Sequence, residues 1–384
     1  MLRRHWLLGL YALVAIGVTA QRLLLHKQNV FRIFASASRI MLAGANPYEA
    51  HPAQYLDFFR YSPAFAIAFA PFALAPEWLG LAAWNLVNAL GLYWVINRLL
   101  PRTQAQLVLF LVLGDLARTM QSCQSNGLVT ALMIAAFLAY SGDRLWRGAF
   151  AVAAGAAIKI FPAGAILFAL LGRRRRRALI LAAGAGAALL VAPALLVGPE
   201  QLLLQYARWA AQEHAETFKP MHSLMDLLDV WAGYYGPRLP VQLAGLAVLL
   251  LPAALRPDLR HDSTWRLKLL CSLLVFSVLF NYGAEPPSFV IATTGIAIWY
   301  ATGPRTLLPG LLMVFTLALV GAEGIGVWPR VVHDWLFDNR ISVIPLLAAW
   351  VAIQRDLLER PQTPWAEPAG PEPRLDQEPS LAAA

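Results

Sequence analysis

The sequence predicts an all-α protein that enters or crosses a membrane many times, with about 10–13 membrane segments of which some are broken or re-entrant. Its composition is 59% hydrophobic and only 14% charged, with a mean hydropathy of +0.55, whereas soluble domains carry about 25% charged residues. Apolar runs of about 15–22 residues recur along the chain, close to the length that a helix needs to cross a bilayer. The runs are continuous rather than alternating, which indicates helices and not barrel strands.

In chain order, the expected membrane segments lie near residues 7–25, 62–76, 79–97, 105–120, 127–141, 149–171, 178–197, 240–255, 267–281, 288–302, 306–321 and 341–354. Several are too short to cross upright, so tilted or broken helices are expected. The first run follows Arg3 and Arg4, but no small-residue cleavage site follows it, and we interpret it as an uncleaved span. Residues 1–358 then form one membrane domain. Residues 359–384 are rich in Pro, Glu and Ala, which predicts a disordered cytoplasmic tail.

Arginine placement predicts which loops face the cytoplasm, because short cytoplasmic loops are enriched in Lys and Arg. The basic clusters are at residues 3–4, 173–177 and 256–268. With these inside, the loops at 26–61, 198–239, 282–287 and 322–340 face outward. The same rule accounts for the net charge of +9 without a nucleic-acid partner.

One apolar stretch, 149–171, conflicts with a simple crossing. Arg144 and Arg147 precede it, and a run of five arginines follows it, so a single span would put one cluster on the outer side. Two half-helices that bend at Lys159–Pro162 would return the chain to the side from which it came. We therefore expect a hairpin here.

The outward segment Asn46–Pro63, NPYEAHPAQYLDFFRYSP, gathers aromatic, basic and acidic side chains. Asp57 or Glu49 is a candidate general base, since a carboxylate beside a bilayer is partly desolvated. Arg60 either binds an anion or pairs with Asp57, and the spacing alone leaves both readings open. Tyr48 and Tyr61 are candidate contacts to a hydroxylated ligand.

Three further segments carry polar residues between apolar runs. Lys159, inside AAIKIFPAG, is either a phosphate ligand or a lysine that reaches back to the interface. Gln124 and Asn126, in QSCQSN, suit hydrogen bonding to a ligand or contacts between helices. Asn281 and Glu285, in NYGAEPPS, suit ligand binding, or in the case of Glu285 a helix N-terminus. The outward aromatic residues would pack on sugar rings or anchor the membrane interface; they include Trp209, Trp231, Tyr234, Tyr235 and Trp328.

The cysteines and histidines predict neither a metal site nor a disulfide framework. Cys123 and Cys271 lie in or beside apolar runs and lack metal-binding spacing. The outward histidines His214, His222 and His333 match no zinc pattern. The chain also lacks a nucleotide-binding pattern, so no cofactor is expected.

Four segments in fixed order carry a family resemblance: GANPY, then FRYSPAFAIAFAPFALAPEWLGLAAWNLVNAL, then QSNGLVTALMIAAF, then AIKIFPAG. Together they resemble glycosyltransferase family 87, the DUF2029 group. The resemblance implies a GT-C-like helical scaffold whose first outward loop carries an acidic residue. It also implies a polyprenyl-phosphate-sugar donor. The better-known members resemble mannosyltransferases.

One departure concerns the acid. Many family members have an aspartate near the start of the first outward loop, where this chain has Gln28-Asn29-Val30. Asp57 lies three residues before the arginine of the matching RYSP block, and we assign the base to it. The implied activity is transfer of a mannose-like hexose from the lipid donor to a hydroxyl of a glycan or glycolipid, at the outer face of the bacterial plasma membrane. The alternatives are a transporter or flippase for a lipid or sugar-lipid, and an inactive family member.

Overall fold

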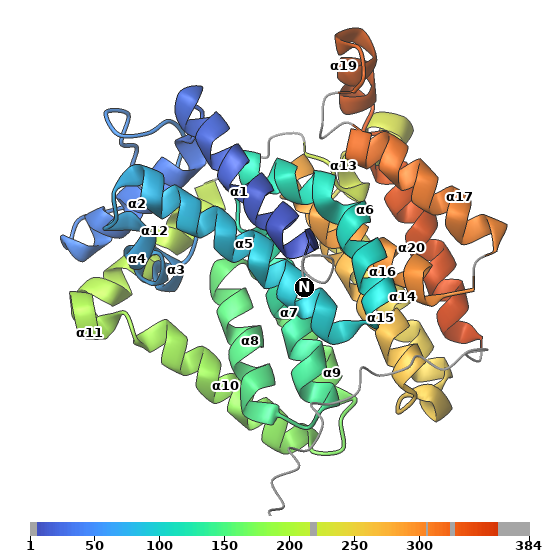
Figure 1. Ribbon diagram of the computed structural model, residues 1–384. Coiled ribbons are helices and arrows are strands. Elements are labelled where there is room, and N and C mark those ends of the chain that lie inside the picture. The colour runs from blue at the N-terminus through green and yellow to red at the C-terminus, as the bar shows by residue number, and fades with distance from the viewer. Residues whose placement is uncertain (1–5, 216–220, 305, 323–326, 360–384) are drawn as a thin grey trace, which may run out of the picture.

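A computed structural model describes residues 6–215, 221–304, 306–322 and 327–359, and these residues form helices without any strand (Figure 1). The first half comprises α1 (Trp6–Leu24), α2 (Asn29–Leu42), α3 (Pro63–Ala68), α4 (Ala70–Ala73), α5 (Glu77–Leu99), α6 (Arg102–Gln121), α7 (Asn126–Ser141), α8 (Leu145–Ile158), η2 (Phe161–Ile166), α9 (Leu167–Leu170) and α10 (Arg175–Val191). The second half comprises α11 (Ala194–Val197), α12 (Pro199–Ala215), α13 (Leu224–Ala232), α14 (Arg238–Leu255), η3 (Pro257–Leu259), α15 (Ser263–Leu279), η4 (Pro286–Ser288), α16 (Phe289–Thr302), α17 (Leu307–Thr316), the π-helical η5 (Leu317–Gly321), α19 (Arg330–Asp338) and α20 (Val343–Leu358).

The core of the molecule is α16, which packs against α15, α6, α7 and α20. Its sequence is apolar on all sides, and a helix of that kind is stable only when it is surrounded by protein or lipid. Gly295 permits the close contact with α15, because a Cβ atom there would lie 2.7 Å from the carbonyl oxygen of Cys271. Because α16 has no polar face that would orient it toward water, its position is set by close packing against α15.

Few of the described helices are long enough to cross a bilayer upright. Four pass by length and apolarity, namely α1, α5, the Arg175–Val197 unit and α14. A fifth is possible if α19 and α20, which are bent by 54° at their break, form one span. The other apolar helices are shorter, as expected for tilted or broken segments.

The span expected at 62–76 is wrong. The chain instead forms α3 and α4, with Pro63 and Pro71 in their first turns. Proline donates no backbone hydrogen bond and starts a helix more readily than it continues one. Together the two helices rise about 15 Å at 1.5 Å per residue, which is half of a bilayer core.

The hairpin expected at 149–171 is present. α8 ends at Ile158, η2 packs back against it, and α9 then leads to α10 (Figure 1). Asp143, just before α8, pairs with Arg174, just after α9, at 2.8 Å between Oδ2 and Nη1. This ion pair puts both ends of the hairpin at the same end of the molecule. Gly155 keeps the two arms close, since a Cβ atom there would lie 2.8 Å from Cβ of Pro162.

An aromatic cluster joins α2 to α3 and α5. Phe34 makes edge contacts with Phe65, Phe69 and Trp84, with ring centroids 5.2–6.3 Å apart. Edge-to-face pairs of this kind add about 0.5–1.5 kcal/mol each beyond the burial of their area. The cluster anchors the loop between α2 and α3, which carries Asp57 and Arg60.

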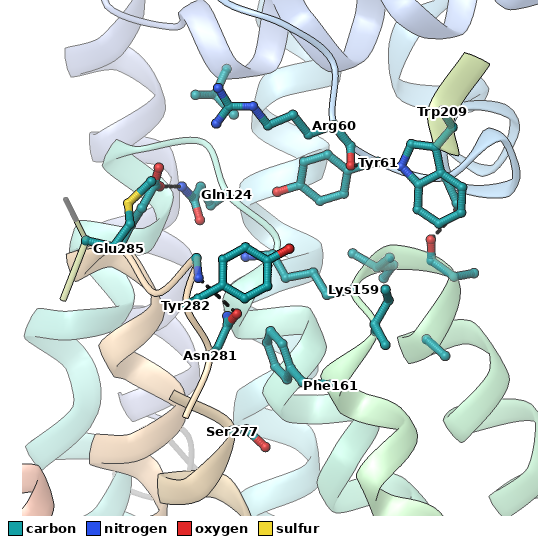
Figure 2. A pocket seen from close by; sticks show the side chains of 18 of the residues that line it. Arg60, Tyr61, Gln124, Lys159, Phe161, Trp209, Ser277, Asn281, Tyr282 and Glu285 are labelled. Carbon is teal, nitrogen blue, oxygen red and sulfur yellow. Dashed lines mark hydrogen bonds between the residues drawn. The ribbon is translucent and has the colours of Figure 1, made fainter. Parts of the chain in front are cut away.

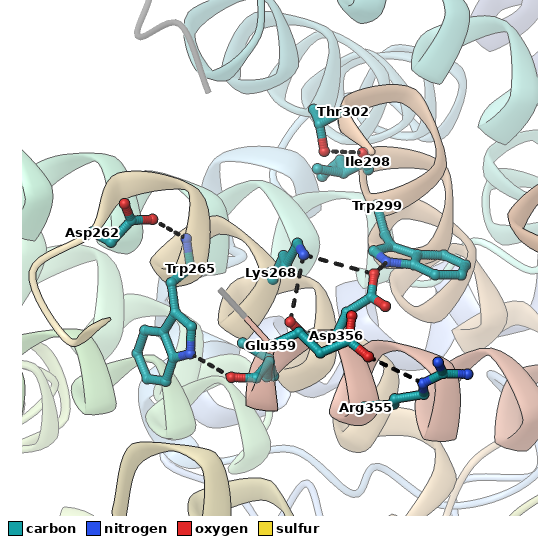
Figure 3. Close-up of polar contacts among 10 residues, drawn as sticks. Asp262, Trp265, Lys268, Ile298, Trp299, Thr302, Arg355, Asp356 and Glu359 are labelled. Atoms are coloured by element: carbon teal, nitrogen blue, oxygen red, sulfur yellow. Dashed lines mark hydrogen bonds and ion pairs between the residues drawn. The ribbon is translucent and has the colours of Figure 1, made fainter. Parts of the chain in front are cut away.

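At the opposite end, polar contacts tie α15, α16 and α20 together (Figure 3). The indole of Trp299 donates to Asp356 Oδ2 at 2.9 Å, and Lys268 Nζ lies 3.7 Å from the same oxygen. The indole of Trp265 donates to the carbonyl of Leu357 at 2.9 Å. The tail expected at 359–384 lies outside the described residues, except for Glu359.

Candidate functional site

A pocket of about 480 Å³ opens where the α2–α3 loop, the tip of the α8–η2 hairpin and the α15–α16 loop meet (Figure 2). Its apolar wall comes from α2, the hairpin and α15. Its polar lining consists of Asp57, Arg60, Tyr61, Ser62, Gln124, Lys159, Trp209, Gln242, Ser277, Asn281, Tyr282 and Glu285. Six segments that are far apart in the sequence therefore supply one site.

Lys159 lies at the tip of the hairpin. α8 stops at Ile158, and Lys159 has extended backbone angles, φ −144° and ψ 144°, which turn the chain toward Pro162. Its ammonium donates to Asn126 Oδ1 at 2.7 Å and lies 6.0 Å from the centre of the Phe161 ring. The side chain thus points into the pocket.

The segment Gln124–Asn126 connects Lys159 to Glu285. Asn126 Nδ2 donates to Gln124 Oε1 at 2.9 Å, and Gln124 Nε2 donates to Glu285 Oε2. Asn126 is fully buried and does not line the pocket, whereas Gln124 and Glu285 do. The Glu285 side chain does not cap η4, because it bonds to Gln124 and not to a backbone N–H of η4.

Asp57 and Arg60 form an ion pair at the mouth of the pocket, with 3.1 Å between Oδ1 and Nη2. The same carboxylate oxygen accepts from the backbone N–H of Phe58 at 2.9 Å. Asp57 has φ 82°, a left-handed conformation that aspartate tolerates better than most residues. The structural pairing left open by the spacing is therefore present, and both side chains still line the pocket.

Asn29 holds the backbone just before Asp57. Its Nδ2 donates to the carbonyl oxygen of Leu56 at 2.7 Å, and its Oδ1 accepts from the N–H of Leu56 at 2.9 Å. A carboxylate at position 29 would keep the second bond but would have no donor for the first. The amide that departs from the family pattern thus clamps the loop that carries Asp57.

In a comparison with known protein families, residues 58–281, more than half of the chain, match glycosyltransferase family 87. The chain belongs to glycosyltransferase family 87. Comparison with curated proteins gave no match. The matched region of this family 87 glycosyltransferase contains Arg60, Tyr61, Gln124, Lys159 and Asn281. Asp57 and Glu285 lie just outside it at either end.

Of the remaining predicted site residues of the family 87 protein, Asn281 lines the pocket, whereas Glu49 and Tyr48 do not. Glu49 is exposed, accepts from Asn46 Nδ2 at 2.6 Å and does not line the pocket. Tyr48 is buried behind the site, and its hydroxyl donates to the carbonyl of Tyr61 at 3.0 Å. Asn281 lines the pocket, and its Oδ1 accepts from the N–H of Gly283 at 3.1 Å. The structure therefore brings Asp57 to the site and leaves Glu49 outside it.

Tyr61 and Trp209 add hydrogen-bonding and aromatic surface to the pocket. Burial, together with the Glu285 carboxylate, raises the pKa of the Tyr61 hydroxyl, so it remains a donor. The indole of Trp209 donates to the carbonyl of Arg60 at 3.3 Å and lines the pocket beside it (Figure 2). Both are the kind of surface on which a sugar packs.

Sequence reasoning missed Gln242, Ser277 and Tyr282. Gln242 lies on α14, lines the pocket and donates to the carbonyl of Phe280 at 2.9 Å. It was a lone amide in an otherwise apolar run, and this isolation was the available signal. The described residues contain no group of three His, Cys, Asp or Glu side chains arranged to hold a metal ion.

Proposed function

We propose that this family 87 glycosyltransferase transfers a mannose-like hexose from a polyprenyl-phosphate donor to a hydroxyl of a glycan or glycolipid, at the outer face of the bacterial plasma membrane. One observation carries the proposal: Lys159, Arg60, Asp57 and Glu285 line the same pocket. A leaving phosphate needs cations, and an acceptor hydroxyl needs a carboxylate base.

Lys159 is the proposed ligand of the donor phosphate. Its ammonium has three donors, and the bond to Asn126 uses one of them. A partly buried cation attracts an anion more strongly than an exposed one, because the local dielectric constant is lower. Arg60 lines the same pocket and supplies further N–H donors.

The apolar wall of the pocket suits the first isoprenoid units of the donor. Ile158, Ile160, Phe161, Phe276 and Phe280 contribute to it. The side chain of Ile160, at the hairpin tip, is 73% exposed. An exposed isoleucine beside a phosphate-binding lysine is expected where an apolar chain meets a charged head group, since both then find a matching surface.

Asp57 is the proposed base. It takes the proton of the acceptor hydroxyl while the hydroxyl oxygen forms a bond to the anomeric carbon. The bond from that carbon to the phosphate oxygen breaks, and its electron pair leaves with polyprenyl phosphate, where Lys159 and Arg60 stabilise the charge. Attack opposite to the leaving group inverts the anomeric configuration. Gln124, Asn281, Tyr61 and Trp209 would orient the two sugars.

The test is transfer of radiolabelled hexose from a polyprenyl-phosphate donor by purified enzyme in detergent or liposomes. Asp57→Asn keeps the shape of the side chain but removes its basicity, so turnover is expected to fall by about 10²–10⁴-fold. Glu49→Gln is the matched control, since it makes the same chemical change on the same loop outside the pocket. It is expected to retain turnover.

Glu285→Gln separates the two pocket carboxylates. Under the proposal it raises KM for the acceptor more than it lowers kcat, because Glu285 binds rather than takes the proton. Full turnover by Asp57→Asn with loss of turnover by Glu285→Gln would transfer the base to Glu285. Movement of the donor across liposomes without sugar transfer would favour a transporter instead.

A further inference from the structure

A chain of hydrogen bonds runs behind the pocket from a cation to an anion. Lys159 Nζ donates to Asn126 Oδ1 at 2.7 Å, Asn126 Nδ2 donates to Gln124 Oε1 at 2.9 Å, and Gln124 Nε2 donates to Glu285 Oε2. Each amide accepts through its oxygen on the side of Lys159 and donates through its NH₂ group on the side of Glu285. The two charged residues come from the α8–η2 hairpin and the α15–α16 loop, which the amides connect.

The direction of this chain is fixed by its two ends. An ammonium only donates, so Asn126 must offer its oxygen to Lys159 and its NH₂ group to Gln124. An ionised carboxylate only accepts, so Gln124 must offer its NH₂ group to Glu285. Neither amide can flip without putting two donors or two acceptors face to face, which leaves buried groups unpaired at a cost of about 1–3 kcal/mol each.

Asn126 also fixes the loop that carries Glu285. Pro286 and Pro287 have no N–H to donate, so this loop is held mainly through its carbonyl groups. The carbonyl of Pro287 accepts from Asn126 Nδ2 at 2.9 Å and from Thr119 Oγ1 at 2.6 Å, and the carbonyl of Ala284 accepts from the N–H of His222 at 2.8 Å. One buried amide therefore contacts both the cation and the loop of the anion.

We infer that Asn126 is a positioning residue that, through Gln124, sets the separation of the Lys159 ammonium and the Glu285 carboxylate across the pocket. This inference rests on the proposed function, in which Lys159 binds the donor phosphate and Glu285 binds the acceptor. Asn126 is buried and does not line the pocket, so it acts on bound donor and acceptor only through its two neighbours. Donor and acceptor are held in register by one side chain that touches neither.

Binding of polyprenyl phosphate, the reaction product, tests the cation arm without any need for turnover. Lys159→Met is expected to weaken this binding by about tenfold or more, which corresponds to about 1.4 kcal/mol. Asn126→Ala is expected to weaken it by a similar factor. The double variant is expected to be no more than about twofold weaker than either single variant, because both changes remove the same positioned cation.

Asn85→Ala is the matched control. Asn85 is equally buried and donates to Thr19 Oγ1 at 2.9 Å, but it does not line the pocket. It should leave polyprenyl phosphate binding unchanged. If Asn126→Ala does not fold, Asn126→Asp keeps the shape and the bond to Lys159 but loses both donated bonds. It should weaken phosphate binding by neutralising the ammonium and raise KM for the acceptor.

The outcomes separate the inference from the function on which it rests. Weaker binding by Lys159→Met with unchanged binding by Asn126→Ala, or fully additive effects, would overturn the positioning role alone. Unchanged binding by Lys159→Met would overturn the phosphate assignment itself, and with it the cation arm of the inference. An unchanged KM for the acceptor in Asn126→Asp would overturn the anion arm.

Discussion

Removal of the Asn29 side chain should loosen the loop that carries Asp57. In the folded protein Asn29 makes two hydrogen bonds to one residue, accepting from the N–H of Leu56 and donating to its carbonyl. Asn29→Ala removes both, and Leu56 must then find water as its partner. The loop remains attached at Tyr48, whose hydroxyl bonds to Tyr61, so the change is local.

The size of the effect follows from these two bonds. An intramolecular hydrogen bond contributes about 0.5–1.5 kcal/mol net, so two contribute about 1–3 kcal/mol. Both bonds are accessible to solvent, which favours the lower half of that range because water can replace them. A loss of about 1.4 kcal/mol raises the open fraction of the loop about tenfold.

Hydrogen exchange of the peptide that contains Leu56 measures this opening directly. We expect its slowest-exchanging amide to exchange about tenfold faster in Asn29→Ala, with a parallel loss of sugar transfer. Asn29→Asp should keep that amide protected, because a carboxylate still accepts its hydrogen bond. Asn46→Ala, which removes another amide from the same loop, should leave the peptide unchanged.

Unchanged exchange in Asn29→Ala would refute the clamp, and the two contacts would then be incidental. Faster exchange with full sugar transfer would refute a different step, namely that the orientation of Asp57 limits the reaction. Equal effects of Asn29→Ala and Asn46→Ala would assign the change to general loosening of the loop.

Two further predictions concern stability. Gly155→Ala puts a Cβ atom 2.8 Å from Cβ of Pro162 and should lower the free energy of unfolding by about 1–3 kcal/mol, as is typical of overpacking. Gly184→Ala, which meets nothing within 4 Å, should not lower it. Equal free energies of unfolding for the two variants would contradict a tight hairpin. Burial, followed by the charge of Arg340, lowers the pKa of His222 to about 4, below its unfolded value of about 6.5. The unfolded chain therefore binds the proton first as pH falls, so stability should be lost between about pH 6.5 and pH 4, by up to about 3 kcal/mol. His222→Phe should remove that part of the pH dependence of stability. An unchanged pH profile of the free energy of unfolding in this variant would exclude His222 as its source.

Much of the site was predictable because each of its segments is a polar interruption of an apolar chain. Lys159 and Glu285 are charged groups between membrane runs, where an uncompensated charge is costly and needs a partner or a ligand. The hairpin was predictable from charge alone, since arginines flank both of its ends.

Other features depend on tertiary contacts that no local pattern contains. Glu49 and Asp57 are both acidic residues on one loop, and only the fold distinguishes the exposed carboxylate from the one at the pocket. Asn29 bonds to a backbone 27 residues away, so its side chain carries no sequence signal of that role. Residues 62–76 have the composition of a membrane helix, but they form two short helices that each begin with a proline in the first turn, and not one span.

The charge symmetry of the α8–η2 hairpin has a consequence for how the chain enters the membrane. Arg144 and Arg147 lie before the apolar stretch, and Arg173–Arg177 lie after it, so passage of either end across the bilayer would carry several guanidinium groups through hydrocarbon. During insertion we expect both ends to stay on the side of synthesis, while the apolar stretch 149–171 enters the bilayer together with Lys159. On this expectation, the arginines that keep both ends of the hairpin on one side also decide that Lys159 enters the bilayer from that side.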